Sequence, residues 1–594
     1  MGLAVAASTA VLAGLLPSAA SAAEPKATVE GDLDKGLRQA LQRAIGEART
    51  APDSSFDARR RAEDAAGAVI AALRSEGYYA YSVEPDVSDT EPPQPIVRVT
   101  PGPRFHIKDA MIAWDGSAPA PRAASAACAA LDLANGTPGR AADVIAAEGR
   151  AVAATQKLGY ADAEARPRRV VVDHADESVQ PTFHIAASDL VHLGAVQVVT
   201  DGRTNPAWVR GLAPWKSGAV YDPDKVAELE RRLSDVGVYD QVTVSLATRD
   251  KTVDGLRPVV VSLADRPPRT LELGAGFSTS EGSGVDAKWI HYNRFHRADT
   301  LTFTAKLYDI QQKLDAEVDL PHWRRPGQTL KLGGGFFGDS TKAYDDIGGG
   351  LRFDVERRFT RTSYITVGAA VDYADTHEKT AVNAQAVPVG QNLKLLIPSG
   401  LVAFALDKSN DPLNPTRGWR LEARAEPTLI TIDRTLTYVK LQSQATAYLP
   451  IGGSDSTVLA GRIKVGSMVG GRLPDVPADR RFFAGGGGSV RGYAYQAVGP
   501  RLSDNTPQGG VSLFEASGEI RQRVADHWGV VGFVDAGSVG ANIAPDFRDV
   551  SVGVGVGVRY DLGFGPLRLD VATPLRRKKG DSLFQIYISI GQSF

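Results

Sequence analysis

Hydrophobic and polar residues alternate one by one from residue 268 to the end of the chain. The clearest runs are 271–277, 365–372, 419–426 and 550–558, where every second residue is apolar and the residues between are mostly glycine or charged. A period of two is typical of a β-strand with two unlike faces. For one strand a water-soluble β-sandwich explains the alternation equally well. Because the alternation continues to the end of the chain and follows an export-type N-terminus, the pattern favours a transmembrane antiparallel β-barrel with apolar residues outward.

The barrel segment, residues 267–594, has room for about 16 strands, because each needs roughly 9–11 residues to cross the membrane. In the last predicted strand Ile586, Ile588, Ile590 and Phe594 share one face. That strand has to close against the first, near 269–279. Glycine packs poorly in a strand, so a weak lateral seam is predicted there, although these glycines would also relieve crowding in the lumen. The seam residues are Leu271, Gly274, Gly276, Gly591 and Phe594.

Residues 24–266 show helical periods instead, and a turn that repeats. The tetrads beginning at Gly77, Gly159 and Gly237 lie 82 and 78 residues apart, each after a helix-like run and before strand-like runs. In the third copy Asp222 and Pro223 begin a helix that Gly237 ends. This spacing predicts three tandem α+β domains at 23–102, 103–188 and 189–266. Chance similarity of the turns is the alternative.

The N-terminal run from Leu3 to Leu16, followed by Ala20-Ser21-Ala22, predicts a signal peptide at 1–22, although it lacks an early Lys or Arg. A buried helix is the alternative. No later run is long enough for a membrane helix of ~18–20 residues. Cys128 is the single cysteine, which excludes an internal disulfide, and the net charge of −2 favours no nucleic-acid partner.

A glycine-rich stretch, Gly485 to Gly488, leads into Val490-Arg491-Gly492-Tyr493 within a long gap between strand-like runs. Four glycines let a chain bend and approach a wall closely. We therefore expect residues 468–510 to form a loop inside the lumen. Asp535 has the opposite parity to Val534, so it points inward, where its carboxylate can accept hydrogen bonds from Arg491. The alternative is that Arg491 lies exposed in the loop. A lumenal network is predicted beside them from Glu515, Glu519 and Arg521.

No enzyme motif is present. His106, His174, His184 and His192 lack metal-ligand spacing, and there is no nucleophile elbow or phosphate-binding loop. We expect no cofactor, no metal and no catalytic residue. The basic run 576–579 falls in an outer loop, where it either contacts lipid phosphates or is simply solvated.

Four motifs carry a resemblance to a known family. They are Val490-Arg491-Gly492-Tyr493, Phe533-Val534-Asp535-Ala536-Gly537, the turn Asp411–Gly418, which contains Asn-Pro-Thr-Arg-Gly, and the terminal Phe594. With three repeats before them, the chain resembles the BamA/TamA superfamily of outer-membrane-protein assembly factors, most closely its TamA branch. The resemblance implies tandem α+β POTRA domains followed by a barrel of about 16 strands. It also implies a functional lock formed by Arg491, Gly492, Tyr493, Phe533, Asp535 and Gly537.

The resemblance further implies what the protein does. Periplasmic POTRA domains would take up unfolded outer-membrane protein clients, autotransporters included, by adding strands to a sheet edge. The seam would open toward outer-membrane lipid, and a TamB-like protein anchored in the inner membrane would reach the first POTRA domain. The alternatives are a two-partner-type secretion pore for one exoprotein and a shortened BamA-like general insertase. A passive porin is disfavoured by the three N-terminal domains.

Overall fold

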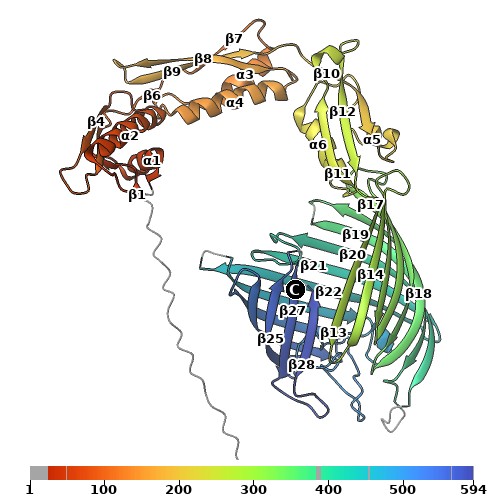
Figure 1. Cartoon of the computed structure of the whole chain (residues 1–594). Helices are drawn as coiled ribbons and strands as arrows, with labels where there is room; N and C mark the ends of the chain where they lie inside the picture. The colour runs from red at the N-terminus through yellow and green to blue at the C-terminus, as the bar shows by residue number, and fades with distance from the viewer. Residues whose placement is uncertain are drawn as a thin grey trace, which may run out of the picture. The chain divides into compact units, whose positions relative to one another are not determined.

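The computed structural model describes residues 24–48, 50–360, 362–382, 389–452, 455–563, 565–590, 592 and 594. The predicted signal peptide and Gly591 lie outside these ranges. The chain divides into two compact units, the first containing the described residues up to Ala195 together with 215–225 and 247–258. The second contains the rest, so residues 192–265 are shared between the two units. Figure 1 shows the elements of both.

The first N-terminal module, residues 24–100, is a three-stranded sheet with two helices. The sheet order is β2 (Thr28–Glu30), β5 (Pro95–Thr100), β4 (Ser82–Val87), and the helices are α1 (Lys35–Ile45) and α2 (Ser55–Ser75); β1 (Glu24–Pro25) pairs with β3 (Glu47–Ala48). Asp34 caps α1 by accepting from the backbone N–H of Leu37 at 2.9 Å. Both helices bury an apolar stripe, including Leu41 and Val69, with the sheet residue Val97.

The second and third modules repeat this plan. The second, residues 106–186, contains β6 (His106–Ile107), β7 (Met111–Trp114), α3 (Pro121–Leu131), α4 (Ala141–Lys157), β8 (Glu164–Asp173) and β9 (Ser178–Ala186). The third, residues 192–265, contains β10 (His192–Thr200), α5 (Pro206–Gly211), α6 (Pro223–Ser234), β11 (Tyr239–Leu246) and β12 (Leu256–Asp265), in the sheet order β10-β12-β11.

The repeated glycines end the second helix of each module. Gly77, Gly159 and Gly237 have φ of +90°, +103° and +74°, the left-handed region in which glycine is favoured. The predicted third helix is confirmed: Asp222 accepts from the N–H of Asp224 at 3.0 Å, and α6 begins at Pro223. None of the helices in the described part of the chain is both long and apolar enough to cross a membrane.

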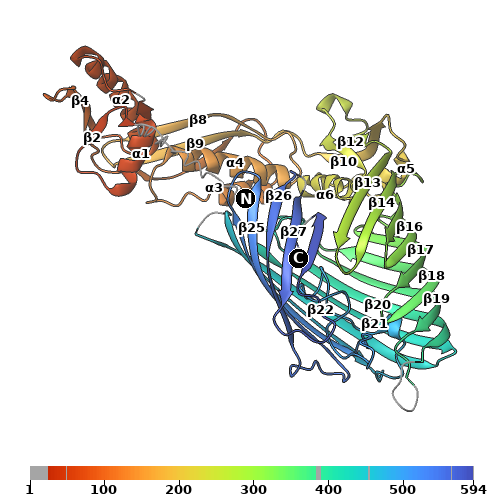
Figure 2. The same cartoon turned by 60° about the horizontal axis from the view of Figure 1, so that its bottom comes forward.

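Residues 269–590 form a closed antiparallel barrel of sixteen strands, which confirms the predicted architecture. Figure 2 shows the tilted strands, from β13 in green to β28 in blue. Their bounds are β13 Arg269–Ser278, β14 Gly282–Tyr292, β15 Thr300–Tyr308, β16 Gln311–Leu320, β17 Gln328–Ser340, β18 Tyr344–Arg358, β19 Tyr364–Glu378, β20 Gln391–Asp407, β21 Gly418–Ile432, β22 Leu436–Ile451, β23 Thr457–Val469, β24 Ser512–Arg523, β25 Trp528–Gly540, β26 Ser551–Asp561, β27 Pro566–Pro574 and β28 Gln585–Ile590.

The alternation in sequence becomes two faces in the barrel wall. Leu273, Phe336 and Val534 are exposed on the outside, at 73%, 72% and 51%, whereas Asp535 on the inside is fully buried. Odd-numbered strands run away from the end where residue 269 enters, and even-numbered strands return. The segment between β23 and β24, residues 470–511, therefore lies at the far end of the barrel. It packs in a buried cluster that includes Val490, Tyr493 and, from β20, Leu395.

Candidate functional site

Glycines bring the 470–511 segment, which we call loop six, against the barrel wall. Gly485 and Gly486 have φ of +107° and +101°. Gly492 has φ of +97°, and a Cβ there would lie 2.8 Å from the backbone carbon of Thr573 on β27. A side chain at position 492 would thus be strained and would clash with backbone that cannot give way.

The close approach carries Arg491 into a buried site, where its side chain is only 2% exposed. The Nε and Nη2 groups donate to the two carboxylate oxygens of Asp535 at 2.6 and 2.9 Å. The Nη1 group lies 2.8 Å from Glu519 and 3.0 Å from Asp570. The guanidinium also lies 3.4 Å from the ring centroid of Phe533. This combines a bidentate, charge-assisted ion pair with a cation–π contact.

Further arginines surround the same carboxylates. Arg521 lies 2.9 Å from Glu519, Arg559 and Arg568 lie 2.5 and 2.7 Å from Asp570, and Arg462 lies 3.2 Å from Glu515. The predicted network residues Glu515, Glu519 and Arg521 therefore belong to the buried cluster. Asp535 differs from Glu519 and Asp570, which each contact more than one arginine, because within the described residues Arg491 is its sole ion-pair partner. Removal of Arg491 would leave the Asp535 charge uncompensated.

The remaining predicted lock residues also lie at this contact. A Cβ at Gly537 would lie 2.6 Å from a methyl group of Val490, so glycine makes room for loop six. The Tyr493 hydroxyl donates to the carbonyl of Arg576 at 2.9 Å. The structure thus brings together all six residues of the lock: Arg491, Gly492, Tyr493, Phe533, Asp535 and Gly537.

Sequence reasoning missed several participants on the last strands. Asp570, Arg559 and Arg568 were not predicted, nor was Tyr587 on β28, which is 3% exposed. The Tyr587 hydroxyl accepts from the N–H of Gly492 at 3.2 Å and donates to the Tyr493 carbonyl at 3.3 Å. One sequence signal could have found these residues: each has the inward-facing parity of its strand, β26, β27 or β28. Loop six is consequently bonded to the strand that closes the barrel.

That closure is short. The pairs are Phe277 with Ile588 and Ser278 with Tyr587, extended by the Thr279 N–H, which donates to the Ile586 carbonyl at 3.2 Å. On its other side β13 pairs with β14 from Arg269 to Ser278. Within the described residues, 269–276 of β13 therefore have no strand partner on the β28 side.

The predicted seam residues are placed differently from one another. Leu271 is 60% exposed, on the part of β13 that β28 does not reach. A Cβ at Gly274 would lie 2.5 Å from Asp286, and one at Gly276 would lie 3.4 Å from the Tyr308 hydroxyl. Gly274 thus makes space for the Asp286 side chain, the alternative explanation raised by the sequence, whereas a Cβ at Gly276 would make only an ordinary van der Waals contact. Gly591 is outside the described residues.

Phe594 is not at the seam, so that assignment is wrong. β28 ends at Ile590, and the ring of Phe594 packs in the cluster of Tyr448, Val458 and Ala460 on β22 and β23. It lies 5.5 Å from the Arg462 guanidinium and 5.4 Å from that of Arg521. The two cations and the Arg521 bond to its carbonyl oxygen, at 3.1 Å, account for this inward placement.

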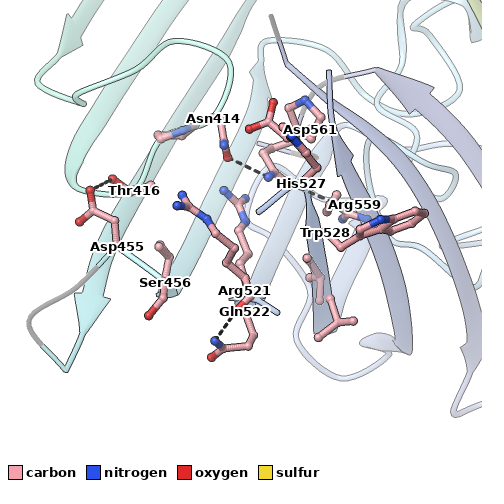
Figure 3. Close-up of a pocket in the computed structure, with 18 of the residues that line it drawn as sticks. Asn414, Thr416, Asp455, Ser456, Arg521, Gln522, His527, Trp528, Arg559 and Asp561 are labelled. Atoms are coloured by element: carbon pink, nitrogen blue, oxygen red, sulfur yellow. Dashed lines mark hydrogen bonds between the residues drawn. The ribbon is translucent and has the colours of Figure 1, made fainter. Parts of the chain in front are cut away.

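The tail meets the predicted turn motif in a pocket drawn in Figure 3, whose lining includes Asn414, Arg521 and Arg559. The Gln592 side chain donates to Asn414 at 3.0 Å and accepts from Arg559 at 3.1 Å. The turn 411–418 is therefore in contact with the end of the chain. Among the described residues no group of His, Cys, Asp and Glu is arranged to hold a metal ion.

A separate ion pair lies in the N-terminal unit. Arg257 on β12 is 4% exposed and donates to both oxygens of Asp162, at 2.7 and 2.6 Å. Asp162 belongs to the repeated turn of the second module, so this pair joins the second module to the third. The hydrogen bonds from Arg257 lower the pKa of Asp162.

Comparisons with known proteins agree with the fold. The Omp85 superfamily domain matches residues 293–594, just over half of the chain. The outer membrane protein assembly factor BamA of Neisseria meningitidis serogroup B is 24% identical over 477 residues, covering 70% of this chain and 58% of that protein. BamA of Neorickettsia risticii is 21% identical over 447 residues, with coverages of 71% and 57%. The chain thus spans less than two thirds of the length of these relatives.

A solved structure of BamA from Haemophilus ducreyi lacking POTRA domains 1–3 matches with a TM-score of 0.66 at 17% identity, covering 82% of this chain and all of that one. The barrel and the family place the protein in the outer membrane, with its N-terminal modules in the periplasm. The end of the barrel where residue 269 enters is accordingly the periplasmic end. Loop six therefore leaves and rejoins the barrel at its extracellular end. The chain belongs to the Omp85 superfamily, and it resembles BamA proteins in sequence and in fold.

Proposed function

We propose that this protein is an outer-membrane protein assembly factor that inserts β-barrel and autotransporter clients through a lateral seam between β13 and β28. The short seam is the observation that carries the proposal. Because β28 reaches only the extracellular end of β13, residues 269–276 present backbone groups without a strand partner among the described residues. Unpaired strand groups in a membrane are strongly driven to pair. An incoming client strand would satisfy them.

Loop six supplies the stability that the short seam lacks. We propose that the lock holds the barrel in its competent shape, because Arg491 fixes loop six to β25 and Tyr587 joins loop six to β28. A seam closed by few backbone hydrogen bonds, each worth about 0.5–1.5 kcal/mol net, opens at a cost of a few kcal/mol. Side-chain bonds from loop six then decide how often it opens.

We assign the three periplasmic modules as POTRA domains at 23–102, 103–188 and 189–266. Three such domains support a role like that of the TamA branch, in which a TamB-like inner-membrane-anchored protein binds the first domain. Phe56, at the start of α2 in that domain, is 80% exposed and gives an apolar point of attachment. Tyr79 is less suitable for contact, since its ring packs against Phe105.

The central experiment is insertion of an unfolded eight-strand barrel client into liposomes containing the protein. In a Cys128→Ser background, the pair Phe277→Cys and Ile588→Cys, which face each other across the seam, would be oxidised. Oxidation should abolish insertion and reduction should restore it. The matched control is Val285→Cys with Leu307→Cys, an equally lipid-facing pair between β14 and β15. If the oxidised seam inserts clients at the normal rate, the seam is not the route.

A photoreactive residue replacing Phe56 in intact cells distinguishes the finer roles. Capture of a large β-rich protein anchored in the inner membrane supports the TamA-like role. Capture of assembly lipoproteins and many nascent barrels indicates a BamA-like general insertase. Capture of one secreted exoprotein indicates a two-partner-type secretion pore. The lock is tested separately, because Arg491→Ala and Asp535→Ala should each impair insertion in a barrel that still folds.

A further inference from the structure

Loop six also contacts a second part of the barrel wall. Its residues Leu473, Val476 and Phe482 share one buried cluster with residues of β20, β21 and β22. Counted from β13, these are the eighth to tenth strands, whereas the lock contacts lie on β25 to β28, the thirteenth to sixteenth. Loop six is therefore held by two separate arcs of the wall.

An ion pair fixes the loop to the second arc. The Arg481 side chain is 5% exposed and lies 2.5 Å from Glu378, the last residue of β19, which is 2% exposed. Arg481 also donates to the Thr380 hydroxyl at 3.0 Å. Because both charges are buried, parting them is costly. We call Arg481, Glu378 and Thr380 the far-wall anchor.

The same arginine organises the loop around this contact. Arg481 donates to the carbonyls of Val476 and Gln508, at 2.8 and 3.0 Å, and so ties the two arms of loop six together. Its neighbour Arg480 lies 3.2 Å from Asp372, which is also on β19. One guanidinium thus joins both arms of the loop to the wall.

A loop that is bonded to two arcs of a barrel couples their movements. When the seam opens, β28 has to move away from β13. If loop six were held only by β25 to β28, it would move with these strands, and its bonds to Tyr587 would not resist opening. Because the far-wall anchor holds the loop in place, movement of β28 has to part Tyr587 from it.

We propose that Arg481 is a positioning residue for the seam: through its pair with Glu378 it holds loop six to the far wall, so that the lock resists separation of β28 from β13. The proposal rests on the proposed function and specifies how opening is regulated. The far-wall anchor and the lock act in series, because loop six resists opening only while both of its attachments hold. Loss of either should release the seam, and loss of both should add little more.

Amide hydrogen exchange of the full-length protein in detergent micelles measures this coupling. The N–H of Thr279 donates to the Ile586 carbonyl at 3.2 Å across the seam, so its exchange reports opening. Arg481→Gln changes no contact of the seam itself, yet should speed this exchange about tenfold. Glu378→Gln leaves the bonds within loop six intact and should speed it about threefold. Amides of the β17–β18 ladder should not change.

A combined variant distinguishes positioning from simple loss of stability. Arg491→Ala releases the lock, and adding Arg481→Gln to it should give Thr279 exchange no faster than the faster single variant. Independent contributions would multiply instead. Arg481→Lys keeps the charge and should fall between the wild type and Arg481→Gln. The matched control is Arg472→Gln, which removes an 85% exposed arginine of loop six that pairs with Asp475 and should leave Thr279 exchange as it was.

Four results would each overturn the proposal. They are unchanged Thr279 exchange in Arg481→Gln or in Glu378→Gln, multiplied effects in the combined variant, an equal effect of Arg472→Gln, and an equal rise in the β17–β18 ladder. Client insertion by the same variants should fall, because a barrel without the far-wall anchor loses its competent shape.

The seam disulfide separates this inference from the proposed function. If Thr279 exchange responds as expected but the oxidised pair Phe277→Cys with Ile588→Cys still inserts clients, the proposed function fails and the role of Arg481 in seam opening stands. If oxidation blocks insertion but Thr279 exchange ignores Arg481→Gln, the inference fails and the proposed function stands.

Discussion

Replacement of Arg491 by alanine tests the lock most directly. The change removes the bidentate bond to Asp535 and the contacts with Glu519 and Asp570. Glu519 keeps Arg521, and Asp570 keeps two arginines, but Asp535 loses the sole cation it has among the described residues. Breaking a buried ion pair by removing one partner costs about 3–5 kcal/mol. Undocking of loop six should therefore become roughly 10²- to 10⁴-fold more frequent.

The magnitude depends on the orphaned carboxylate, so a second variant isolates it. Asp535→Asn in the Arg491→Ala background removes the uncompensated charge and should recover about 1–3 kcal/mol. Asp535→Asn alone should cost less than Arg491→Ala, since Arg491 retains Glu519 and Asp570. Arg491→Lys keeps the charge but cannot form the bidentate pair, and should fall between the wild type and Arg491→Ala.

Amide hydrogen exchange of the full-length protein measures undocking. The N–H of Gly486 donates to the Tyr493 carbonyl at 3.1 Å, and the N–H of Gly492 donates to Tyr587, so both report on loop six. Amides in the β17–β18 ladder serve as an internal control for global unfolding. The reasoning is refuted if Arg491→Ala accelerates exchange at these glycines less than tenfold, or if the double variant exchanges as fast as the single one.

Three further predictions follow from other contacts. Tyr587→Phe keeps the buried ring but loses the hydroxyl bonds, which should speed amide exchange in β28 by about tenfold. Gly553→Ala places a Cβ against the carbonyl oxygen of Arg491, so loop six should be expelled and become cleavable by protease added outside. The pKa of Asp162 is lowered in the folded state, so its ion pair with Arg257 stabilises the contact between the second and third modules at pH values above the unfolded pKa of about 3.9. This stability is lost as the pH falls through the lowered pKa. Segment 187–191, which links the two modules, should therefore become more sensitive to protease at acid pH.

Each of these has a control. Tyr560→Phe changes an exposed tyrosine on β26 and should leave β28 exchange as it was, so an equal effect of both variants contradicts the Tyr587 prediction. Gly532→Ala meets no atom within 4 Å and should leave loop six protected. Arg257→Gln should make the joint sensitive at neutral pH and remove its response to acid; a retained response contradicts the assignment to Asp162.

Local patterns in the sequence were sufficient for the barrel and for the centre of the lock. Alternation fixes which face a strand residue occupies, and this placed Asp535 inside and Val534 outside. Helix ends were readable because Gly77, Gly159 and Gly237 adopt a conformation that favours glycine. The amphipathic α1 was not predicted, although its apolar spacing was visible. The small-residue helix α3 lacks such a signal.

Contacts between strands distant in sequence were not readable in the same way. Asp570 and Tyr587 have inward parity, but only the register of β25 to β28 places them beside Arg491. Phe594 shows the opposite failure. Its alternation with Ile590 predicted that the last strand continues to Phe594. Instead, its contacts with Arg462 and Arg521 hold the ring in the lumen, and no local sequence pattern shows such contacts.

The seam and loop six act as one unit because they share β27 and β28. Tyr587 pairs with Ser278 through the backbone and bonds loop six through its hydroxyl. Arg568 on β27 donates to the Gly487 carbonyl at 3.2 Å and binds Asp570, which also contacts Arg491. A client strand that displaces β28 from β13 therefore breaks few backbone bonds but also has to part Tyr587 from loop six. The free energy of opening resides mostly in these side-chain contacts. Weakening them should let the seam open without unfolding the barrel, but the barrel then loses the competent shape that the lock holds, so insertion is still expected to be impaired.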